Sequence, residues 1–289
     1  MNITFVLPIN RSGGTRVLAA YTRLLSARGH RVVLISPSAG QPWSIRSLFL
    51  WGKGRKPLAS SPLDGLGAEH RVLDRWRPVR DSDVPDADVV IATWWETAEW
   101  VSKLNQSKGQ KVYFIQGHEI YSWLPQERTR ATYRLPIRKI VISRWLQEIM
   151  RVEYGDSSVE LVPNGVDHSM FDAPARGKQL RPTVGILHST TPLKRFDLAV
   201  SVLQVVRRSV PDLQVLAFGL EAPVSPLPDF VHFTRDPPQH DLRELYAKCD
   251  VWLTASSSEG FNLPAMEAMA CRTPVIATRT GWPAEAVVD

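Results

Sequence analysis

The chain has few cysteines and no long hydrophobic runs, and both absences exclude classes of protein. Cys249 and Cys271 are its only cysteines and have no metal-ligand spacing between them, so we interpret both as reduced packing residues. The longest apolar runs, such as residues 89–92, are strand-length and far short of the roughly 20 residues that span a membrane. Residues 1–7 lack the basic start of a signal peptide. We therefore expect a cytoplasmic globular protein.

Positive charge is in modest excess. The 35 Lys and Arg residues outnumber the 29 Asp and Glu residues, giving a net charge of +6. This excess favours anionic partners, namely phosphate ligands, an anionic membrane or nucleic acid, although a basic surface that serves solubility is an equal alternative. The basic residues are dispersed and no recognition motif accompanies them, so we expect no nucleic-acid binding.

Strand and helix patterns alternate through the first half of the chain. Residues 2–7 form a buried-strand pattern, which is followed by a glycine turn and by apolar residues at helical spacing. Gly29 ends this helix and residues 31–35 form the next strand, so a βαβ unit and a parallel sheet are predicted. Further strands are predicted at 88–93, 111–116, 139–142 and 159–162. The pattern indicates a doubly wound, Rossmann-like domain over residues 1–172.

A second alternation follows a polar stretch that contains Pro and Gly at residues 171–182, where we place the linker. Five strands and three helices are predicted beyond it: strands 183–187, 213–218, 230–233, 251–254 and 275–278, and helices 194–208, 240–248 and 263–271. The fold class is therefore α/β, with two Rossmann-like parallel sheets facing each other and a second domain over residues 181–289. Ligands of such folds bind at the carboxyl ends of the strands.

Residues 43–62 mix Trp, Leu and Phe with Arg and Lys. Such a basic, aromatic stretch is typical of a segment that rests on an anionic membrane surface. The alternative is an acceptor-side loop whose aromatic residues fold back on the protein, which its glycines and proline favour.

The stretch after the strand at 251–254 contains the most informative residues. Asn262 is a good N-cap and Pro264 lies in the first turn, so a helix is predicted from about Leu263. The amides near that helix start, together with the helix dipole, make an anion site suited to a diphosphate, and Gly260 lets the backbone approach closely. The carboxylates of Glu259 and Glu267 flank it. An ordinary capped helix is the alternative.

The amino-acid sequence of this stretch resembles the motif of a known family. Glu259 and Glu267 stand in E-x7-E spacing within EGFNLPAMEAMACRTPVIAT, which is similar to the signature of retaining glycosyltransferases of family 4. The phrase at 163–167 (PNGVD) and the opening Gly-Gly turn and helix resemble the same family. Together these motifs cover nearly the whole chain in the right order, and the E-x7-E phrase is the most specific. The resemblance implies a GT-B fold.

The resemblance also implies a donor site in the second domain. Glu267 would bind the ribose hydroxyls of a nucleotide-diphosphate sugar and Glu259 the donor sugar. Lys194 matches the family's diphosphate lysine, and a cation at a helix N-terminus is unfavourable unless it has a ligand. The remaining implied donor-binding residues are Gly14, Arg195, Gly260, Phe261, Asn262 and Leu263. The donor would be a UDP-, GDP- or dTDP-sugar, with no other cofactor.

His118 follows a strand, where the family often carries a histidine on the acceptor side of the reaction centre. The resemblance makes His118 and Glu259 the catalytic candidates; a hydrogen-bonded loop histidine is the alternative, and Glu119 either orients it or lies on the surface. The family retains the anomeric configuration, and the departing phosphate helps to take the acceptor proton. We interpret Asp81-Ser82-Asp83 as a charged connection and not a D-x-D metal motif, so we expect no metal site.

Some positions depart from the family pattern. His188 stands where the family usually has an arginine, and Arg195 is a candidate replacement. The turn at 218–223 leaves base recognition unassigned, and the chain stops at Asp289, so we expect a second domain that is incomplete relative to the family. The expected function is transfer of a sugar to a glycan, lipid-linked or small-molecule acceptor, as in polysaccharide biosynthesis, with peripheral membrane association. The alternatives are a catalytically silent sugar-nucleotide-binding or scaffold protein and a GT-B epimerase or phosphorylase.

Overall fold

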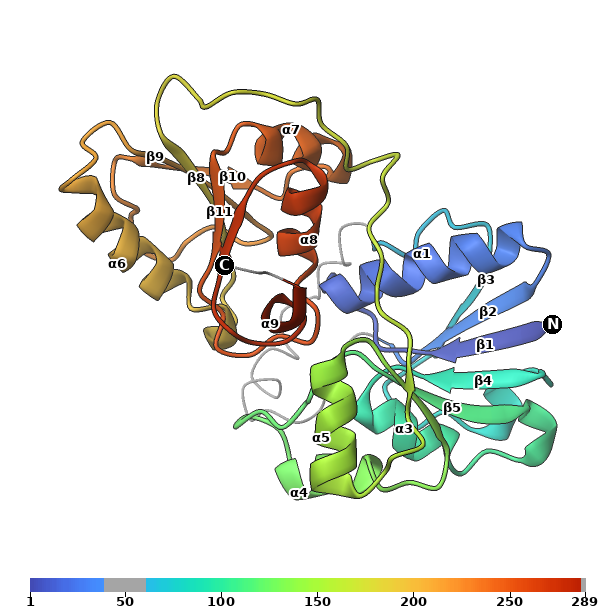
Figure 1. The fold of residues 1–289 in the computed structure, drawn as a ribbon. Helices are drawn as coiled ribbons and strands as arrows, with labels where there is room; N and C mark the ends of the chain where they lie inside the picture. Colours follow the sequence, from blue (N-terminus) through green and yellow to red (C-terminus); the bar gives the residue numbers. More distant parts are fainter. Residues whose placement is uncertain (39–60, 287–289) are drawn as a thin grey trace, which may run out of the picture. The chain divides into compact units, whose positions relative to one another are not determined.

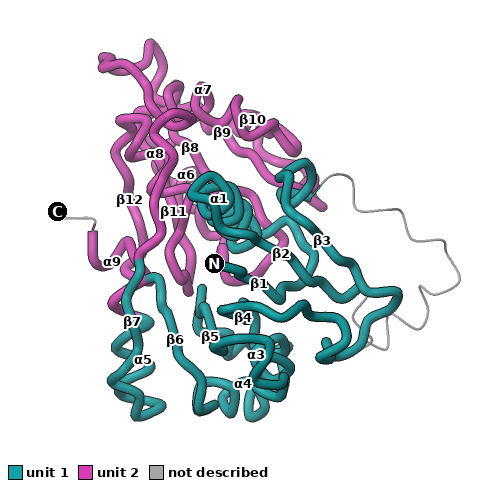
Figure 2. The backbone as a smooth tube through the Cα atoms, turned by 90° about the vertical axis from the view of Figure 1, so that its right-hand side faces the viewer, with its two compact units in different colours: residues 1–142, 146–162 teal, residues 143–145, 163–289 magenta. Residues whose placement is uncertain are grey.

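A computed structural model of the chain describes residues 1–38 and 61–286. The described residues form two compact units (Figure 2). Unit 1 comprises those of Met1–Ile142 and Leu146–Val162, and unit 2 comprises Ser143–Trp145 and those from Pro163 onward. The segment 163–182, which contains the predicted linker, belongs to unit 2, where Phe171 and Ala173 are buried in the core.

Unit 1 is built on a sheet of seven strands in the order β3-β2-β1-β4-β5-β6-β7, and every neighbouring pair is parallel. The parallel sheet predicted from the opening βαβ unit is therefore confirmed (Figure 1). In chain order the strands are β1 (Asn2–Val6), β2 (Arg31–Ser36), β3 (Glu69–Val72), β4 (Val89–Ala92), β5 (Gln110–Ile115), β6 (Arg138–Val141) and β7 (Glu160–Leu161).

The helices in this part of the chain are α1 (Gly13–Ala27), α3 (Trp95–Val101), α4 (Gln126–Thr132) and α5 (Arg144–Tyr154), with short 3-10 turns η1 (Asp81–Asp83) and η2 (Gln106–Lys108). The ends of α1 follow from its sequence. The Ser12 hydroxyl accepts the Thr15 amide at the start, and Gly29 takes φ +82° just past the end, as predicted.

Unit 2 is built on five parallel strands in the order β10-β9-β8-β11-β12. The strands are β8 (Thr183–Leu187), β9 (Gln214–Gly219), β10 (Val231–Arg235), β11 (Val251–Thr254) and β12 (Val275–Ala277). The helices are α6 (Phe196–Arg207), α7 (Leu242–Ala247), α8 (Leu263–Ala270) and α9 (Pro283–Ala286), with 3-10 turns η3 (Pro192–Lys194) and η4 (Gln239–Asp241). All five predicted strands are present.

Two hydrophobic clusters cover the two faces of the second sheet. Phe218 and Trp252 pack with residues of α7 and α8, whereas Val215 and Ala217 pack with residues of α6. This division follows the alternation of side chains along β9. Figure 1 shows α6 on one face of the sheet and α7 and α8 on the other.

The basic, aromatic segment predicted at 43–62 lies outside the described residues, apart from its last two positions. Among the helices that the structure describes, none is long and apolar enough to cross a membrane.

Candidate active site

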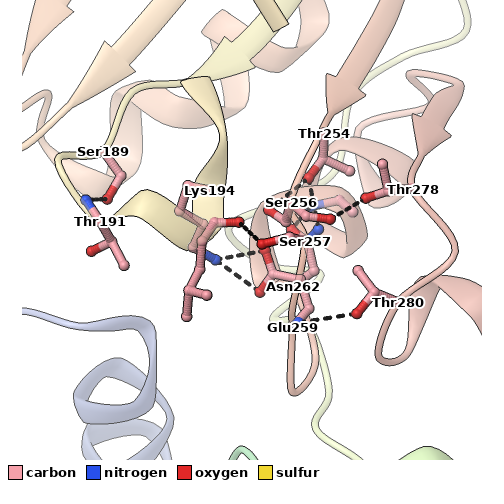
Figure 3. Close-up of polar contacts among 12 residues, drawn as sticks. Ser189, Thr191, Lys194, Thr254, Ser256, Ser257, Glu259, Asn262, Thr278 and Thr280 are labelled. Carbon is pink, nitrogen blue, oxygen red and sulfur yellow. Dashed lines mark hydrogen bonds and ion pairs between the residues drawn. The ribbon is translucent and has the colours of Figure 1, made fainter. Parts of the chain in front are cut away.

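An ion pair joins two loops at the carboxyl edge of the second sheet. β8 and β11 are parallel neighbours, so the loops that follow them leave the same edge. The first loop ends in η3, which carries Lys194, and the second carries Glu259 (Figure 3). The Lys194 Nζ lies 2.6 Å from Glu259 Oε1 and 2.8 Å from Oε2. Glu259 is buried, and its charge is balanced by this lysine.

The start of α8 lies beside this pair. The Asn262 Oδ1 accepts the Ala265 amide at 3.4 Å, and its Nδ2 donates to the Thr254 Oγ1 at 3.0 Å, so the predicted N-cap is confirmed. Asn262 itself is left-handed, with φ 71°, a conformation that asparagine tolerates better than most residues.

Four consecutive backbone amides lie just before α8 and at its first residue. They donate to no acceptor among the described residues and belong to Gly260, Phe261, Asn262 and Leu263. Unsatisfied amides at a helix N-terminus carry partial positive charge and bind anions. The Lys194 ammonium adds a full positive charge next to them.

The loop after β12 holds Glu259 in place. The Glu259 amide donates to the Thr280 Oγ1 at 3.3 Å, and the Thr278 hydroxyl donates to the Ser256 carbonyl oxygen. Gly281 has φ +60°, and a Cβ there would lie 2.4 Å from the Glu259 carbonyl oxygen. The sequence carried no signal for these contacts beyond the glycine itself.

A cavity of about 310 Å³, including space open to solvent, lies between β8, β11 and the start of α8. Lys194, Glu259 and Asn262 line it, so the structure brings these three predicted donor-site residues together. Phe261 is buried and stacks on Trp282, with ring centroids 5.0 Å apart. Arg195 is exposed and left-handed, with φ 47°, and forms no ion pair with any residue that the structure describes.

Glu267 lies in the second turn of α8 and is 2% exposed. Its Oε2 accepts a hydrogen bond from the Tyr246 hydroxyl of α7 at 2.8 Å. Tyr246 is itself fully buried, so the neighbouring helix α7 holds the Glu267 carboxylate in position. No local sequence pattern marks Tyr246, because its role depends on a contact between helices α7 and α8.

His188 does not replace the charge of an arginine. It is buried, and its ring contacts Phe196 and Phe233 edge to face at centroid distances of 4.6 and 5.3 Å. Burial lowers the pKa of His188, so the ring is neutral at physiological pH. Gly219 allows this arrangement, since a Cβ there would lie 2.4 Å from the His188 carbonyl oxygen. Lys194 therefore supplies the positive charge of the cavity lining.

His118 lies at the carboxyl edge of the first sheet, after β5. Its Nε2 is 2.7 Å from the hydroxyl of Tyr154, the last residue of α5, and 3.9 Å from a Glu153 carboxylate oxygen. Burial lowers the pKa of His118. The neutral ring is a form that can accept a proton or a hydrogen bond.

Glu119 is almost fully buried, so the surface alternative for this residue is wrong. Its Oε2 accepts the Trp95 amide at 2.9 Å and the Tyr113 hydroxyl at 3.3 Å, while its own amide donates to the Tyr133 hydroxyl oxygen at 2.8 Å. Burial raises the pKa of Glu119 to about 8. The residue ties the His118 loop to the start of α3.

Gly14 lies in the first turn of α1 in unit 1, where a Cβ would lie 3.1 Å from the Gln116 Nε2. Gly14 and His118 thus belong to unit 1, and the other predicted site residues belong to unit 2.

The Asp81-Ser82-Asp83 run is engaged within the protein. Asp83 accepts two hydrogen bonds from the Arg77 guanidinium at 2.6 and 2.8 Å, and Asp81 accepts the Asn105 amide at 2.7 Å. Over residues 1–38 and 61–286, no group of three or more His, Cys, Asp or Glu residues is placed to hold a metal ion.

The fold and site define an α/β protein with two parallel sheets, the second of which carries a lysine and unsatisfied amides at its carboxyl edge. The family model described as Glycosyltransferase Family 4 matches residues 11–170, and that described as Glycosyl transferases group 1 matches residues 174–289. The first match covers more than half of the chain, which therefore belongs to glycosyltransferase family 4.

Curated relatives include mycobacterial enzymes. The chain is 32% identical over 203 residues to the GDP-mannose-dependent α-(1-6)-phosphatidylinositol monomannoside mannosyltransferase of Mycolicibacterium smegmatis, covering 60% of this chain and 53% of the relative. It is 28% identical to a GDP-mannose-dependent α-(1-6)-phosphatidylinositol dimannoside mannosyltransferase of Mycobacterium tuberculosis, covering 93% of this chain and 77% of the relative. The chain matches about half or less of the length of the first curated relatives.

Solved structures confirm the fold class. Sucrose-phosphate synthase from Thermosynechococcus elongatus superposes with a TM-score of 0.74 at 16% identity, covering 100% of this chain and 84% of that one. TarM of S. aureus superposes with a TM-score of 0.73 at 12% identity, covering 100% and 88%. At these identities the likeness shows the GT-B fold alone.

Proposed function

We propose that the chain transfers a sugar from a nucleotide-diphosphate sugar to an acceptor, with retention of configuration and without a metal ion. One observation carries the proposal: Lys194 and four unsatisfied amides meet at the start of α8, beside the cavity that Glu259 lines. A leaving diphosphate gathers negative charge as the sugar bond breaks. Oriented donors and a cation at that position stabilise the transition state.

In this proposal the Lys194–Glu259 pair is the resting arrangement of an unliganded donor site. The diphosphate takes the lysine as its partner, and the Glu259 carboxylate then accepts hydrogen bonds from hydroxyl groups of the donor sugar. Glu267, held by Tyr246, binds the ribose hydroxyls. Glu259 is the acidic residue among those that line the cavity, and in this proposal it binds sugar hydroxyls and is not a nucleophile.

We propose GDP-mannose as the donor, because the names of two relatives call them GDP-mannose-dependent. The acceptor we propose is a cyclic polyol, a mannoside or an inositol derivative, free or on a lipid headgroup. Support comes from the same names and from relatives called D-inositol 3-phosphate glycosyltransferase. Peripheral association with the cytoplasmic face of a membrane is part of the proposal for the lipid-linked case.

The test is a thermal-shift series with GDP, UDP, dTDP and ADP and their common sugar conjugates. A ligand that binds only the native state raises Tm by linkage. We expect GDP and GDP-mannose to raise the Tm of the wild type and of Lys248→Met, an exposed control lysine, and to lose the effect in Lys194→Met and Glu267→Gln. Failure of every nucleotide to stabilise the wild type would overturn the donor site.

Turnover then tests the reaction itself. Mannose transfer to an inositol or mannoside acceptor, unchanged by EDTA, with an α-linked product by NMR, is the expected result. A sugar nucleotide that binds without transfer indicates the catalytically silent alternative, which the neutral His188 in place of an arginine favours. Conversion of the sugar nucleotide without any acceptor indicates an epimerase.

A further inference from the structure

The loop after β5 carries an aromatic pair that the proposed donor chemistry does not use. The rings of Tyr121 and Trp123 stack with centroids 4.9 Å apart and an interplanar angle of 20°. Trp123 is nevertheless 54% exposed and is the only aromatic residue among the exposed large hydrophobic residues of the described chain. The exposed face of the indole is therefore open to a ligand.

The pair lies next to His118. The loop closes in a turn in which the Leu124 amide donates to the Tyr121 carbonyl oxygen at 3.0 Å. This turn brings the Tyr121 hydroxyl over Gly117, where it lies 3.5 Å from the position of a glycine Cβ. Gly117 directly precedes His118, so the aromatic pair lies in the same loop and contacts the residue before the histidine.

Polar groups also lie close to His118. The Tyr154 hydroxyl is 2.7 Å from His118 Nε2 and 3.5 Å from an Arg130 nitrogen, and Glu153 lies 3.4 Å from the same guanidinium. An apolar ring surface beside hydrogen-bonding groups matches a saturated ring that has C–H bonds on its faces and hydroxyl groups on its rim.

The charges around the loop favour a neutral ring over an anionic membrane surface. A segment that rests on a membrane combines aromatic residues with unpaired Lys and Arg residues. Here the Arg128 guanidinium donates two hydrogen bonds to Glu99, at 2.7 and 2.5 Å, and Arg130 pairs with Glu153. The arginines of α4 nearest the loop are therefore balanced by carboxylates.

We propose that Tyr121 and Trp123 form a stacking platform for the pyranose or cyclitol ring of the acceptor, with Trp123 supplying the exposed face and His118 lying beside the reacting hydroxyl. This assignment rests on the proposed function and names a site for the acceptor within it.

The experiment is an NMR titration of the whole chain with two soluble, uncharged probes, methyl α-D-mannopyranoside and myo-inositol. Wild type, Trp123→Phe, Trp123→Ala and Leu24→Ala are compared; Leu24 is 53% exposed and lies on α1, which makes it a matched control. Removing the indole should weaken binding of at least one probe by about tenfold, whereas the phenyl ring should keep most of it. Leu24→Ala should bind as the wild type does.

The rise in Tm on addition of GDP is measured for the same variants, because it reports on the donor site and not on the acceptor site. Loss of probe binding in Trp123→Ala with normal Tm and normal GDP stabilisation supports the platform. Probe binding that is unchanged in Trp123→Ala, or undetectable in the wild type, overturns it. Binding of phosphatidylglycerol vesicles that Trp123→Ala abolishes, with no binding of either soluble probe, also overturns it in favour of a membrane contact. A wild type that no nucleotide stabilises refutes the proposed function, while probe binding still decides the platform.

Discussion

Each unit carries a buried glutamate in a loop that follows an interior strand of its sheet, and the two carboxyl groups are held in different ways. Glu259 is 7% exposed and contacts the Lys194 ammonium with both oxygens. Glu119 is 3% exposed and contacts a backbone amide and a tyrosine hydroxyl, and burial raises its pKa to about 8. A buried carboxyl group keeps its charge when a cation compensates for lost hydration, and otherwise holds its proton.

The difference distinguishes the two edges chemically. The edge in unit 2 joins a cation, unsatisfied amides and a charged carboxylate, which suits a charged diphosphate. The edge in unit 1 places a neutral histidine and a largely protonated carboxyl group among tyrosines, which suits a neutral polyol. Substitutions at either glutamate, or at the groups that hold it, test this difference.

The largest effect is expected from removing the cation. Lys194→Met should lower kcat/KM for sugar transfer by about 10²- to 10³-fold, because an oriented charge on the leaving group is lost. Steady-state kinetics at saturating acceptor measure this. Lys248→Met, whose side chain is 67% exposed, should match the wild type. A loss below tenfold in Lys194→Met would show that the lysine does not act on the diphosphate.

The loop that clamps Glu259 should be the next most sensitive. Gly281→Ala adds a Cβ 2.4 Å from the Glu259 carbonyl oxygen at a residue with φ +60°, so we expect a loss of about 2–3 kcal/mol in the free energy of unfolding. Gly67→Ala, with φ +71° and open space, carries the backbone strain alone and should lose about 1–2 kcal/mol. Urea unfolding measures both. Equal losses would mean that the loops are not in contact.

Unit 1 should respond to pH through its buried carboxyl groups. The Glu119 carboxyl releases its proton near pH 4.5 when unfolded and near pH 8 when folded, and burial raises the pKa of Glu96 to about 7. At these two carboxyl groups the folded chain binds more protons in this window, so their contribution to the free energy of unfolding falls as pH rises, by at most about 1.4 kcal/mol per pH unit for each group.

Glu119→Gln keeps an acceptor for the Trp95 amide and removes the titrating group. In urea unfolding from pH 5 to 8, the free energy of unfolding of the variant should decline less steeply with pH than that of the wild type. The part of the decline that comes from Glu96 should remain. An unchanged slope would mean that Glu119 is ionised in the folded chain.

The smallest effect is expected at the tyrosine that contacts the histidine. Tyr154→Phe removes the hydroxyl 2.7 Å from His118 Nε2, and the loss of one hydrogen bond should lower kcat for transfer by about three- to tenfold. The KM for the donor should not change, because Tyr154 belongs to unit 1. A shift of the pH profile of kcat relative to the wild type would distinguish positioning of His118 from a packing role, which would change Tm alone.

Strands with strong apolar patterns were predicted closely from the sequence, and polar edges were not. The strand expected at 183–187 is β8 residue for residue. β3 (Glu69–Val72) was missed, because its sequence is EHRV and it lies at the edge of the sheet with no fully buried side chain. The strand exists because of its pairing with β2, which is a contact 36 residues distant along the chain.

The donor-site residues were predicted one by one, and their contacts were not. The sequence placed Glu259 and Asn262 at the start of α8 and Lys194 after β8. It predicted that each of these residues contacts the donor, and it did not predict contacts among them. Their direct ion pair depends on β8 and β11 being neighbours in the sheet. Tyr246 and Thr280 had no local signal, because each acts through a fold contact with the E-x7-E phrase.

The sequence by itself determined the alternation of strands and helices, the capped start of α8 and the family, because these depend on short-range periodicity, on capping chemistry and on the spelling of motifs. Tertiary structure alone decided which glutamate meets a cation and which is buried without one, that His188 is neutral, and that Tyr154 contacts His118. Those outcomes depend on desolvation and on distances between residues far apart in the chain, and neither quantity is present in a local sequence pattern.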